Sequence, residues 1–180
     1  MIKDLEFDAR MKPASEEDIG RFEAQFGLVL PPSFVDFCRK YNGGGLTDSN
    51  RVFDVPRQFI PFWQEYGSEN VSATVEVDCL CGILPESFPY SVFKALDQLA
   101  PDEVTGSVRG RDPLPPLSET LSSKGKVLPI GYDLMGNYVL AICRYNGVCT
   151  LDFWDHEIES GFAFCDDLEE FYNGLTGANP

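Results

Sequence analysis

The segment from residue 15 to residue 45 constrains the fold most strongly, because it carries the start and stop signals of two consecutive helices. Ser15 is a favoured N-cap, and the three acidic residues after it suit the first turn of a helix. Apolar residues then recur at helical spacing, and Gly27 suits the left-handed position that ends a helix. Pro31 and the proline after it can open a second helix, which Asn42 and the glycine after it end. The sequence therefore predicts a helical hairpin with apolar faces.

Two later segments have the alternating pattern of β-strands. In residues 71–84 apolar and polar side chains alternate over most of the length, which predicts one strand with one face in water. Residues 127–157 predict an antiparallel hairpin, because Asn146 and Gly147 form the sequence preferred in a two-residue type I′ turn. The chain is therefore expected to build an antiparallel-rich sheet beside the helices.

The two-residue turn also predicts the register of this hairpin. It pairs Ile142 with Leu151, and it places Cys143 and Cys149 on opposite faces. A disulfide between these two cysteines is therefore not expected. All six cysteines are predicted to be reduced thiols, since the sequence shows no secretion signal and no cysteine pair with zinc-ligand spacing.

Two further segments complete the outline of the chain. Residues 165–175 have apolar side chains at helical spacing and predict a C-terminal helix with Asp166 as its N-cap. Residues 101–126 are rich in Pro, Ser and Gly, and their acids and bases balance. This segment is interpreted as a long surface loop or insertion, to which no function is assigned.

Two stretches resemble a known group of proteins. The acidic helix start followed by GLVLPPSFVDFCRKYNGGG resembles the N-terminal signature of the SUKH superfamily, which unites Smi/Knr-type cell-wall regulators with bacterial toxin-immunity proteins. The later VLPIG and FWDHE stretches resemble the central pattern of the same superfamily. The resemblance implies structural roles for Leu30, Pro31, Asn42, Gly43, Gly131, Gly136, Trp154 and His156.

The resemblance also implies a fold. The expected architecture is one α+β domain over residues 1–180, in which an antiparallel-rich sheet is packed by the N-terminal helix pair and a C-terminal helix. The sequence departs from the pattern in one respect: the segment of residues 51–126 is longer than expected of a minimal member of the superfamily.

The charge limits the possible partners. The chain has 29 acidic and 14 basic residues, a formal net charge of −15. This charge argues against nucleic acid, whose phosphates need Lys and Arg, and favours a basic protein, with solubility as the alternative reason for the acidity. No apolar run is long enough to cross a membrane, and the first twenty residues lack the apolar core of a signal peptide. We therefore expect a cytoplasmic protein without a membrane partner, and we assume a monomer.

The sequence offers one candidate for catalysis. His156, the only histidine, stands between Asp155 and Glu157 and could serve as a general acid. Neighbouring strand residues point to opposite faces, however, so these three side chains cannot converge on one point. No nucleophile elbow, phosphate-binding loop or metal-ligand pattern occurs. We therefore expect no catalytic residue, no metal and no cofactor, with an enzyme that uses His156 as the alternative.

The C-terminal part of the chain favours protein binding. From Tyr145 to the end there are eight acidic residues and no Lys or Arg. If the hairpin end and the last helix cluster, they form a negative surface with Trp154 as an aromatic anchor. The residues predicted to contact a partner are Asp133, Asp152, Trp154, Asp155, Glu157, Glu159, Asp166 and Asp167.

These residues and the resemblance lead to one functional hypothesis. The chain is expected to be a non-enzymatic immunity protein that binds a cognate toxin, of a basic nuclease or deaminase type, and neutralises it by occlusion. A Smi/Knr-like regulatory module that binds other proteins is the alternative.

Overall fold

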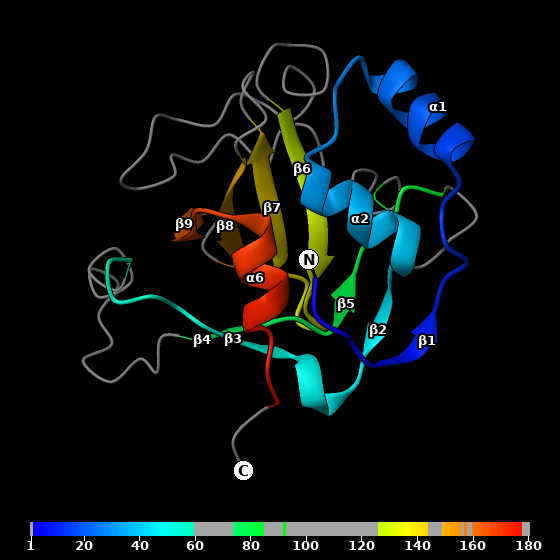
Figure 1. Cartoon of the computed structure of the whole chain (residues 1–180). Coiled ribbons are helices and arrows are strands. Elements are labelled where there is room, and N and C mark those ends of the chain that lie inside the picture. The colour runs from blue at the N-terminus through cyan, green and yellow to red at the C-terminus, as the bar shows by residue number, and fades with distance from the viewer. Residues whose placement is uncertain are drawn as a thin grey trace.

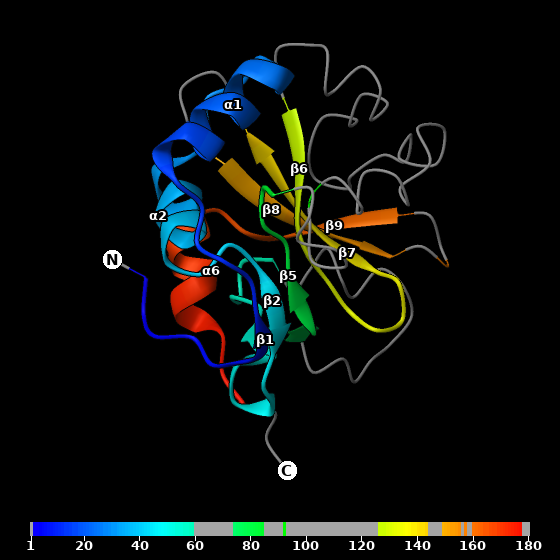
Figure 2. The same cartoon turned by 90° about the vertical axis from the view of Figure 1, so that its right-hand side faces the viewer.

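A computed structural model of the chain describes residues 2–59, 74–84, 92, 126–143, 149–155, 157 and 160–177. These residues form an antiparallel sheet with three α-helices in front of it (Figure 1), and a side view places the helices together on one side of the sheet (Figure 2). The helices are α1 (Glu16–Phe26), α2 (Pro32–Lys40) and α6 (Leu168–Gly174). The expected α+β class, with an N-terminal helix pair and a C-terminal helix on the sheet, is confirmed.

The main sheet has seven strands in the order β1-β2-β5-β6-β7-β8-β9, and every neighbouring pair is antiparallel. Their bounds are β1 (Phe7–Arg10), β2 (Gly44–Leu46), β5 (Cys79–Leu80), β6 (Lys126–Tyr132), β7 (Tyr138–Cys143), β8 (Cys149–Asp155) and β9 (Ser160–Cys165). A second sheet pairs β3 (Val52–Asp54) with β4 (Thr74–Glu76), and the 3₁₀ helix η1 (Asp48–Asn50) precedes β3.

The helix pair forms where its sequence signals predict it. Ser15 caps α1 in a capping box with Asp18, in which each side chain accepts a hydrogen bond from the backbone N–H of the other residue. Gly27 ends α1 in the left-handed conformation, with φ 58°. The helix α2 begins directly after Pro31, as expected of a segment with two prolines at its start. The guanidinium of Arg39 then joins the two helices through Glu16, at 2.6 and 2.8 Å.

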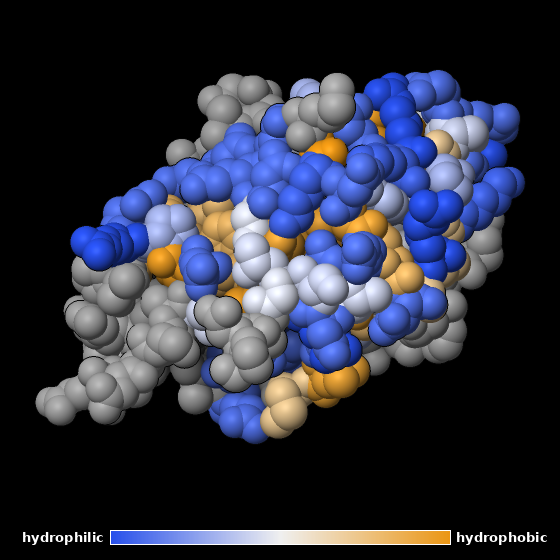
Figure 3. Space-filling model, turned by 60° about the horizontal axis from the view of Figure 1, so that its bottom comes forward, coloured by the Kyte–Doolittle hydropathy of each residue, from blue (hydrophilic) through white to orange (hydrophobic). Residues whose placement is uncertain are grey.

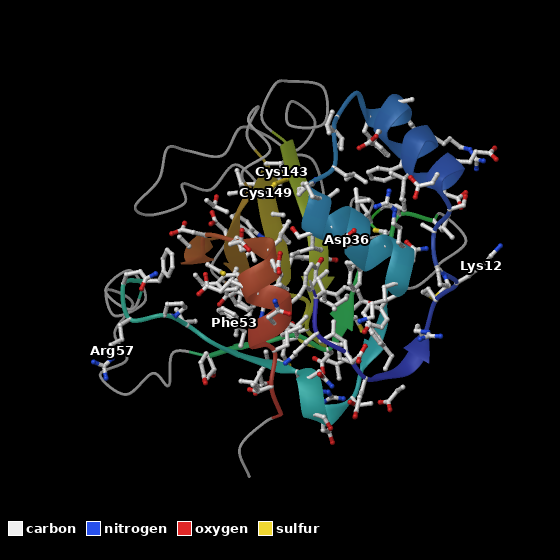
Figure 4. All side chains as sticks on the ribbon, in the orientation of Figure 1. Lys12, Asp36, Phe53, Arg57, Cys143 and Cys149 are labelled. Atoms are coloured by element: carbon white, nitrogen blue, oxygen red, sulfur yellow. A yellow bond between two sulfur atoms is a disulfide. The ribbon has the colours of Figure 1, made fainter. Side chains whose placement is uncertain are left out.

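Aromatic side chains fasten α2 and α6 to the rest of the core. The rings of Phe37 in α2 and Tyr172 in α6 stack with their centroids 4.8 Å apart, and both residues are fully buried. Phe53, which lies beside α6 in Figure 4, contacts Phe164 of β9 and Phe171 of α6. The C-terminal helix therefore connects the helix pair, the small sheet and the last strand of the main sheet.

The alternating segment 71–84 does not form the single strand that its pattern predicts. Residues 74–76 are β4 of the small sheet, and residues 79–80 are β5 of the main sheet. The chain changes partner at Val77 and Asp78, whose N–H groups donate to Arg51 and Tyr132 respectively. Val75, Val77 and Cys79 are all buried. The apolar side chains therefore keep their alternating pattern of burial, although the residues belong to two different strands.

The β7–β8 hairpin also differs from its prediction. Ala141 rather than Ile142 lies opposite Leu151, which shifts the register by one residue. Alternation could not decide the register, because apolar side chains of this hairpin are buried on both faces. The predicted turn at Asn146 lies outside the described residues. So does the predicted loop at 101–126, except for its last residue, which begins β6.

The same shift of register brings Cys143 opposite Cys149, and the two form a disulfide, seen at the ends of β7 and β8 in Figure 4. The prediction that all six cysteines are reduced is therefore wrong for this pair. The other four, Cys38, Cys79, Cys81 and Cys165, are free thiols and buried.

The disulfide gives a first testable prediction. Replacing both Cys143 and Cys149 with serine is expected to lower the free energy of unfolding by about 2 kcal/mol, because the bridge closes a short loop and thereby restricts the unfolded chain. Urea unfolding with and without dithiothreitol measures this difference. The reductant should destabilise the wild type by a similar amount and leave the double variant unchanged, and equal stability of all four samples would contradict the prediction.

The sequence did not reveal β9, which brings the chain back along β8 before α6 begins. The N-cap of α6 is Asp167, not the predicted Asp166. The Oδ1 atom of Asp167 accepts the backbone N–H groups of Glu169 and Glu170 at 2.7 and 2.9 Å. The prediction was wrong by one residue because both positions offer the same carboxylate to the start of the helix.

Candidate functional site

Two of the residues predicted to contact a partner lie in the interior. Trp154 is only 2% exposed and stands opposite Tyr138 in the β7–β8 pairing. Asp152 is fully buried, opposite Leu140. Neither side chain reaches the surface, so Trp154 lacks the exposure that the predicted aromatic anchor requires.

Two acidic residues at the end of β8 are accessible. Asp155 is partly exposed, Glu157 is exposed, and the backbone N–H of Glu157 donates to Oδ1 of Asp155 at 2.9 Å. His156 and Glu159, the candidate general acid and a predicted partner contact, lie outside the described residues.

A second acidic surface lies at the start of α6. Its members, which we call the α6 acidic group, are all exposed: Asp166, Asp167, Glu169 and Glu170. Part of this acidity has a structural reason. Asp167 caps the free backbone N–H groups of α6, and the helix dipole favours negative side chains in the first turn. The group therefore places four acidic side chains at the solvent-exposed start of α6.

The two acidic surfaces lie at opposite ends of β9. This strand begins opposite Asp155 and ends opposite Leu151, and its six residues cover roughly 17 Å at about 3.3 Å per residue. The sequence hypothesis joined the hairpin end and the last helix in one cluster because it placed no strand between them. The structure instead gives one acidic surface at each end of the strand.

The end of the sheet that carries Asp155 also carries the turn from β6 to β7. In this 133–137 turn, Asp133 is 9% exposed and accepts two hydrogen bonds from Asn137, from its backbone N–H at 2.9 Å and its side-chain amide at 2.8 Å. The Asp133 C=O accepts the N–H of Gly136, whose φ of 96° is the left-handed conformation that ends a three-residue hairpin loop. Asp133, predicted as a partner contact, thus organises the turn itself.

Leu134 and Met135 project from this turn into solvent, with 77% and 70% of their area exposed. The backbone N–H of Leu134 donates to Oδ2 of Asp78 at 2.7 Å, which ties the turn to the segment before β5. Figure 3 brings the lower end of the molecule forward, and the described surface there is mostly hydrophilic with small apolar areas. Neither residue was among those predicted from the sequence to contact a partner. The signal was the pair of large apolar residues at turn positions, where polar residues and glycine are usual.

Charges around the turn are mostly negative. Asp78 also pairs with Arg51, at 3.1 Å, and Arg51 approaches Asp48 at 3.3 Å. The β7–β8 register places Asp155 across from Asn137, on the other side of the turn. We call this region the turn-end surface and define it by Asp78, Asp133, Leu134, Met135, Asp155 and Glu157.

The residues carried over from the superfamily pattern, other than His156, lie at packing and turn positions. Leu30 and Pro31 are buried between α1 and α2, and the Leu30 N–H donates to Glu23. Asn42 and Gly43 both have positive φ at the end of α2.

The side chain of Asn42 is fully buried and joins two distant segments. Its Nδ2 donates to the C=O of Lys12 at 3.0 Å, and its Oδ1 accepts the N–H of Ile83 at 2.9 Å. Gly131 lies in β6, where an added Cβ would come within 2.9 Å of the C=O of Cys79. These contacts support a structural rather than a chemical role for the two residues.

The free cysteines are poor nucleophiles in this environment. Burial raises the pKa of the Cys38 and Cys81 thiols far above the usual value, and it raises the pKa of Cys165 to about 12. The fully buried hydroxyl of Tyr172 likewise has a raised pKa because of burial. Since the thiolate is the reactive form, these thiols do not suit covalent catalysis at neutral pH.

Among the described residues, no group of three or more His, Cys, Asp or Glu side chains is placed to hold a metal ion. In the same part of the chain, no helix has both the length and the apolar character needed to span a membrane.

The described residues form an α+β domain that exposes acidic side chains at both ends of β9 and two large apolar side chains in the 133–137 turn. Comparison with protein families identifies this domain: the model of the SMI1 / KNR4 family (SUKH-1) matches residues 13–174. The chain belongs to the SMI1 / KNR4 family. Comparisons with curated proteins and with solved structures returned no significant match.

Proposed function

We propose that this protein is an immunity protein, which binds a basic protein toxin and neutralises it by occlusion without chemistry of its own. The observation that carries the proposal is the exposed acidity of the C-terminal part, where the α6 acidic group and Glu157 lie in a stretch without Lys or Arg. Nuclease and deaminase toxins need basic surfaces for nucleic acid, and an acidic partner can cover them. Membership of the SMI1 / KNR4 family supports a protein-binding role.

Electrostatics gives this proposal a measurable consequence. Complementary charge raises the association rate of two proteins and loses its effect as salt screens it. The α6 acidic group is exposed and is therefore suited to steering more than to buried contacts. Association should accordingly be fast at low ionic strength and slow at high ionic strength.

The proposal predicts that a toxin domain is encoded beside the gene, and the test uses that domain. Co-expression should protect cells and yield a stable complex. Replacing Glu169 and Glu170 with glutamine should slow association at low salt by roughly tenfold, because the rim of the interface loses two charges. The matched control replaces Glu17 and Asp36, two exposed acids of the helix pair, with their amides, and should leave the rate nearly unchanged.

The outcomes separate the parts of the proposal. No complex and no protection would contradict the immunity function. A complex whose formation does not depend on salt would contradict the electrostatic part.

The name of the matched family favours a second candidate, a regulatory module of the Smi/Knr kind that binds other proteins. A gene neighbourhood without a toxin, together with a stable complex with a housekeeping protein, would favour this candidate.

A further inference from the structure

The 133–137 turn holds two large apolar side chains in solvent on a fixed backbone. Asp133 binds Asn137 through both carboxylate oxygens, and Asp78 binds the N–H of Leu134. These hydrogen bonds fix the backbone and do not use the side chains of Leu134 and Met135. With 77% and 70% of their area exposed, the two side chains contribute little to the folded core.

A turn of this kind is well prepared for binding. Association loses free energy when a flexible loop must be ordered, and a loop already fixed by its own hydrogen bonds avoids most of that loss. Interfaces gain most of their affinity from a few large side chains that enter pockets on the partner, surrounded by a polar rim. Leu134 and Met135 have the size and exposure of such anchors, and the more exposed carboxylates of Asp155 and Glu157 have the character of a rim.

The charge around the turn indicates what kind of surface would accept it. Five carboxylates and one guanidinium lie at this end of the described sheet: Asp48, Asp78, Asp133, Asp155, Glu157 and Arg51. An anionic lipid surface would be repelled by this excess. A second copy of the chain would carry the same excess, on a protein of net charge −15. A basic protein is the occupant that the charge favours.

We infer that Leu134 and Met135 are the apolar anchor with which this protein enters an apolar pocket bordered by Lys and Arg on a basic protein partner. The inference rests on the proposed function and names the surface that contacts the toxin. It assigns specificity to the apolar side chains of the turn-end surface, while the exposed carboxylates of this surface and of the α6 acidic group steer association.

The experiment measures binding to the toxin domain that the proposed function predicts beside the gene. Replacing Leu134 and Met135 with serine should weaken binding by roughly tenfold or more, mainly through faster dissociation, because the buried anchors are lost. The melting temperature should not change, since both side chains are exposed in the free protein. Replacing Val29, which is 83% exposed between α1 and α2, with serine is the matched control and should leave binding unchanged.

A variant of the charged rim distinguishes the contribution of the charges from that of the apolar anchor. Replacing Glu157 with glutamine should slow association at low salt and leave dissociation nearly unchanged. If the wild type binds the toxin and the Leu134/Met135 double variant binds equally well, the inference is overturned while the proposed function stands. If the wild type does not bind the toxin, both are overturned.

Two other occupants are tested with the same variants. Sedimentation of the wild type with vesicles of phosphatidylcholine and phosphatidylserine, lost in the double variant, would overturn the inference in favour of a lipid surface. Concentration-dependent dimerisation that the double variant abolishes would overturn it in favour of a second copy.

Discussion

Replacing Gly82 with alanine is expected to lower the free energy of unfolding by about 3 kcal/mol or more, a large part of the roughly 5–15 kcal/mol by which native proteins are stable. A Cβ atom at this position would lie 2.5 Å from the carbonyl carbon and from Oδ1 of Asn42, and closer still to the carbonyl oxygen. Backbone atoms cannot move away as the end of a flexible side chain can. Urea unfolding followed by circular dichroism measures the loss.

The consequence reaches beyond one contact, because Asn42 holds together parts of the chain that are distant in sequence. Displacing it would break its hydrogen bonds to Lys12 and Ile83, and a buried side-chain amide without partners costs about 1–3 kcal/mol. The end of α2, the segment before α1 and the segment after β5 all meet at this residue.

Gly20 supplies the matched control. It lies inside α1, and an added Cβ would meet nothing within 4 Å. Replacing it with alanine should raise the free energy of unfolding by about 0.5–1 kcal/mol, since glycine disfavours the interior of a helix. Opposite signs for the two glycine substitutions are the expected result. A Gly82 variant as stable as the wild type would contradict the role given to the close approach of Asn42.

The helices were predictable from sequence because their signals are local. Ser15, Gly27 and Pro31 each act on the backbone within a few residues, and the structure places the helix ends where these residues indicate. The sheet was less predictable, because strand pairing is decided by residues far apart. Apolar side chains on both faces of the β7–β8 hairpin left its register open, and the structure places Cys143 opposite Cys149, one residue away from the predicted register.

For the candidate site, the sequence predicted the negative charge but not the arrangement of the residues that carry it. Acidic residues near the C-terminus were evident, but their arrangement depended on β9, which divides them between two ends of a strand. The apolar anchor was missed because a pattern of alternation says nothing about a turn. Asp133 and Asp78 together fix the Leu134 backbone, and this relation between residues 55 positions apart appears only in three dimensions.

Replacing Trp154 with alanine is expected to lower the free energy of unfolding by about 3–5 kcal/mol, as is usual for removal of a buried tryptophan. Trp154 is 2% exposed and belongs to the buried core, in contrast to the anchor role that its sequence context suggested. The cavity would lie beside Tyr138, where the β7–β8 hairpin and β9 are paired. Urea unfolding measures the change, and phenylalanine at the same position should cost less because it fills part of the space.

The phenylalanine variant distinguishes a core residue from a contact residue. If Trp154 only supports the sheet, its folded phenylalanine variant binds the toxin domain as tightly as the wild type does, although it unfolds at lower urea concentration. The Leu134/Met135 double variant should show the reverse, unchanged stability with weakened binding. Weakened binding without loss of stability in the Trp154 variant would restore the anchor role to Trp154 and contradict the core position described above. The two variants together therefore separate what holds this sheet together from what the sheet presents to a partner.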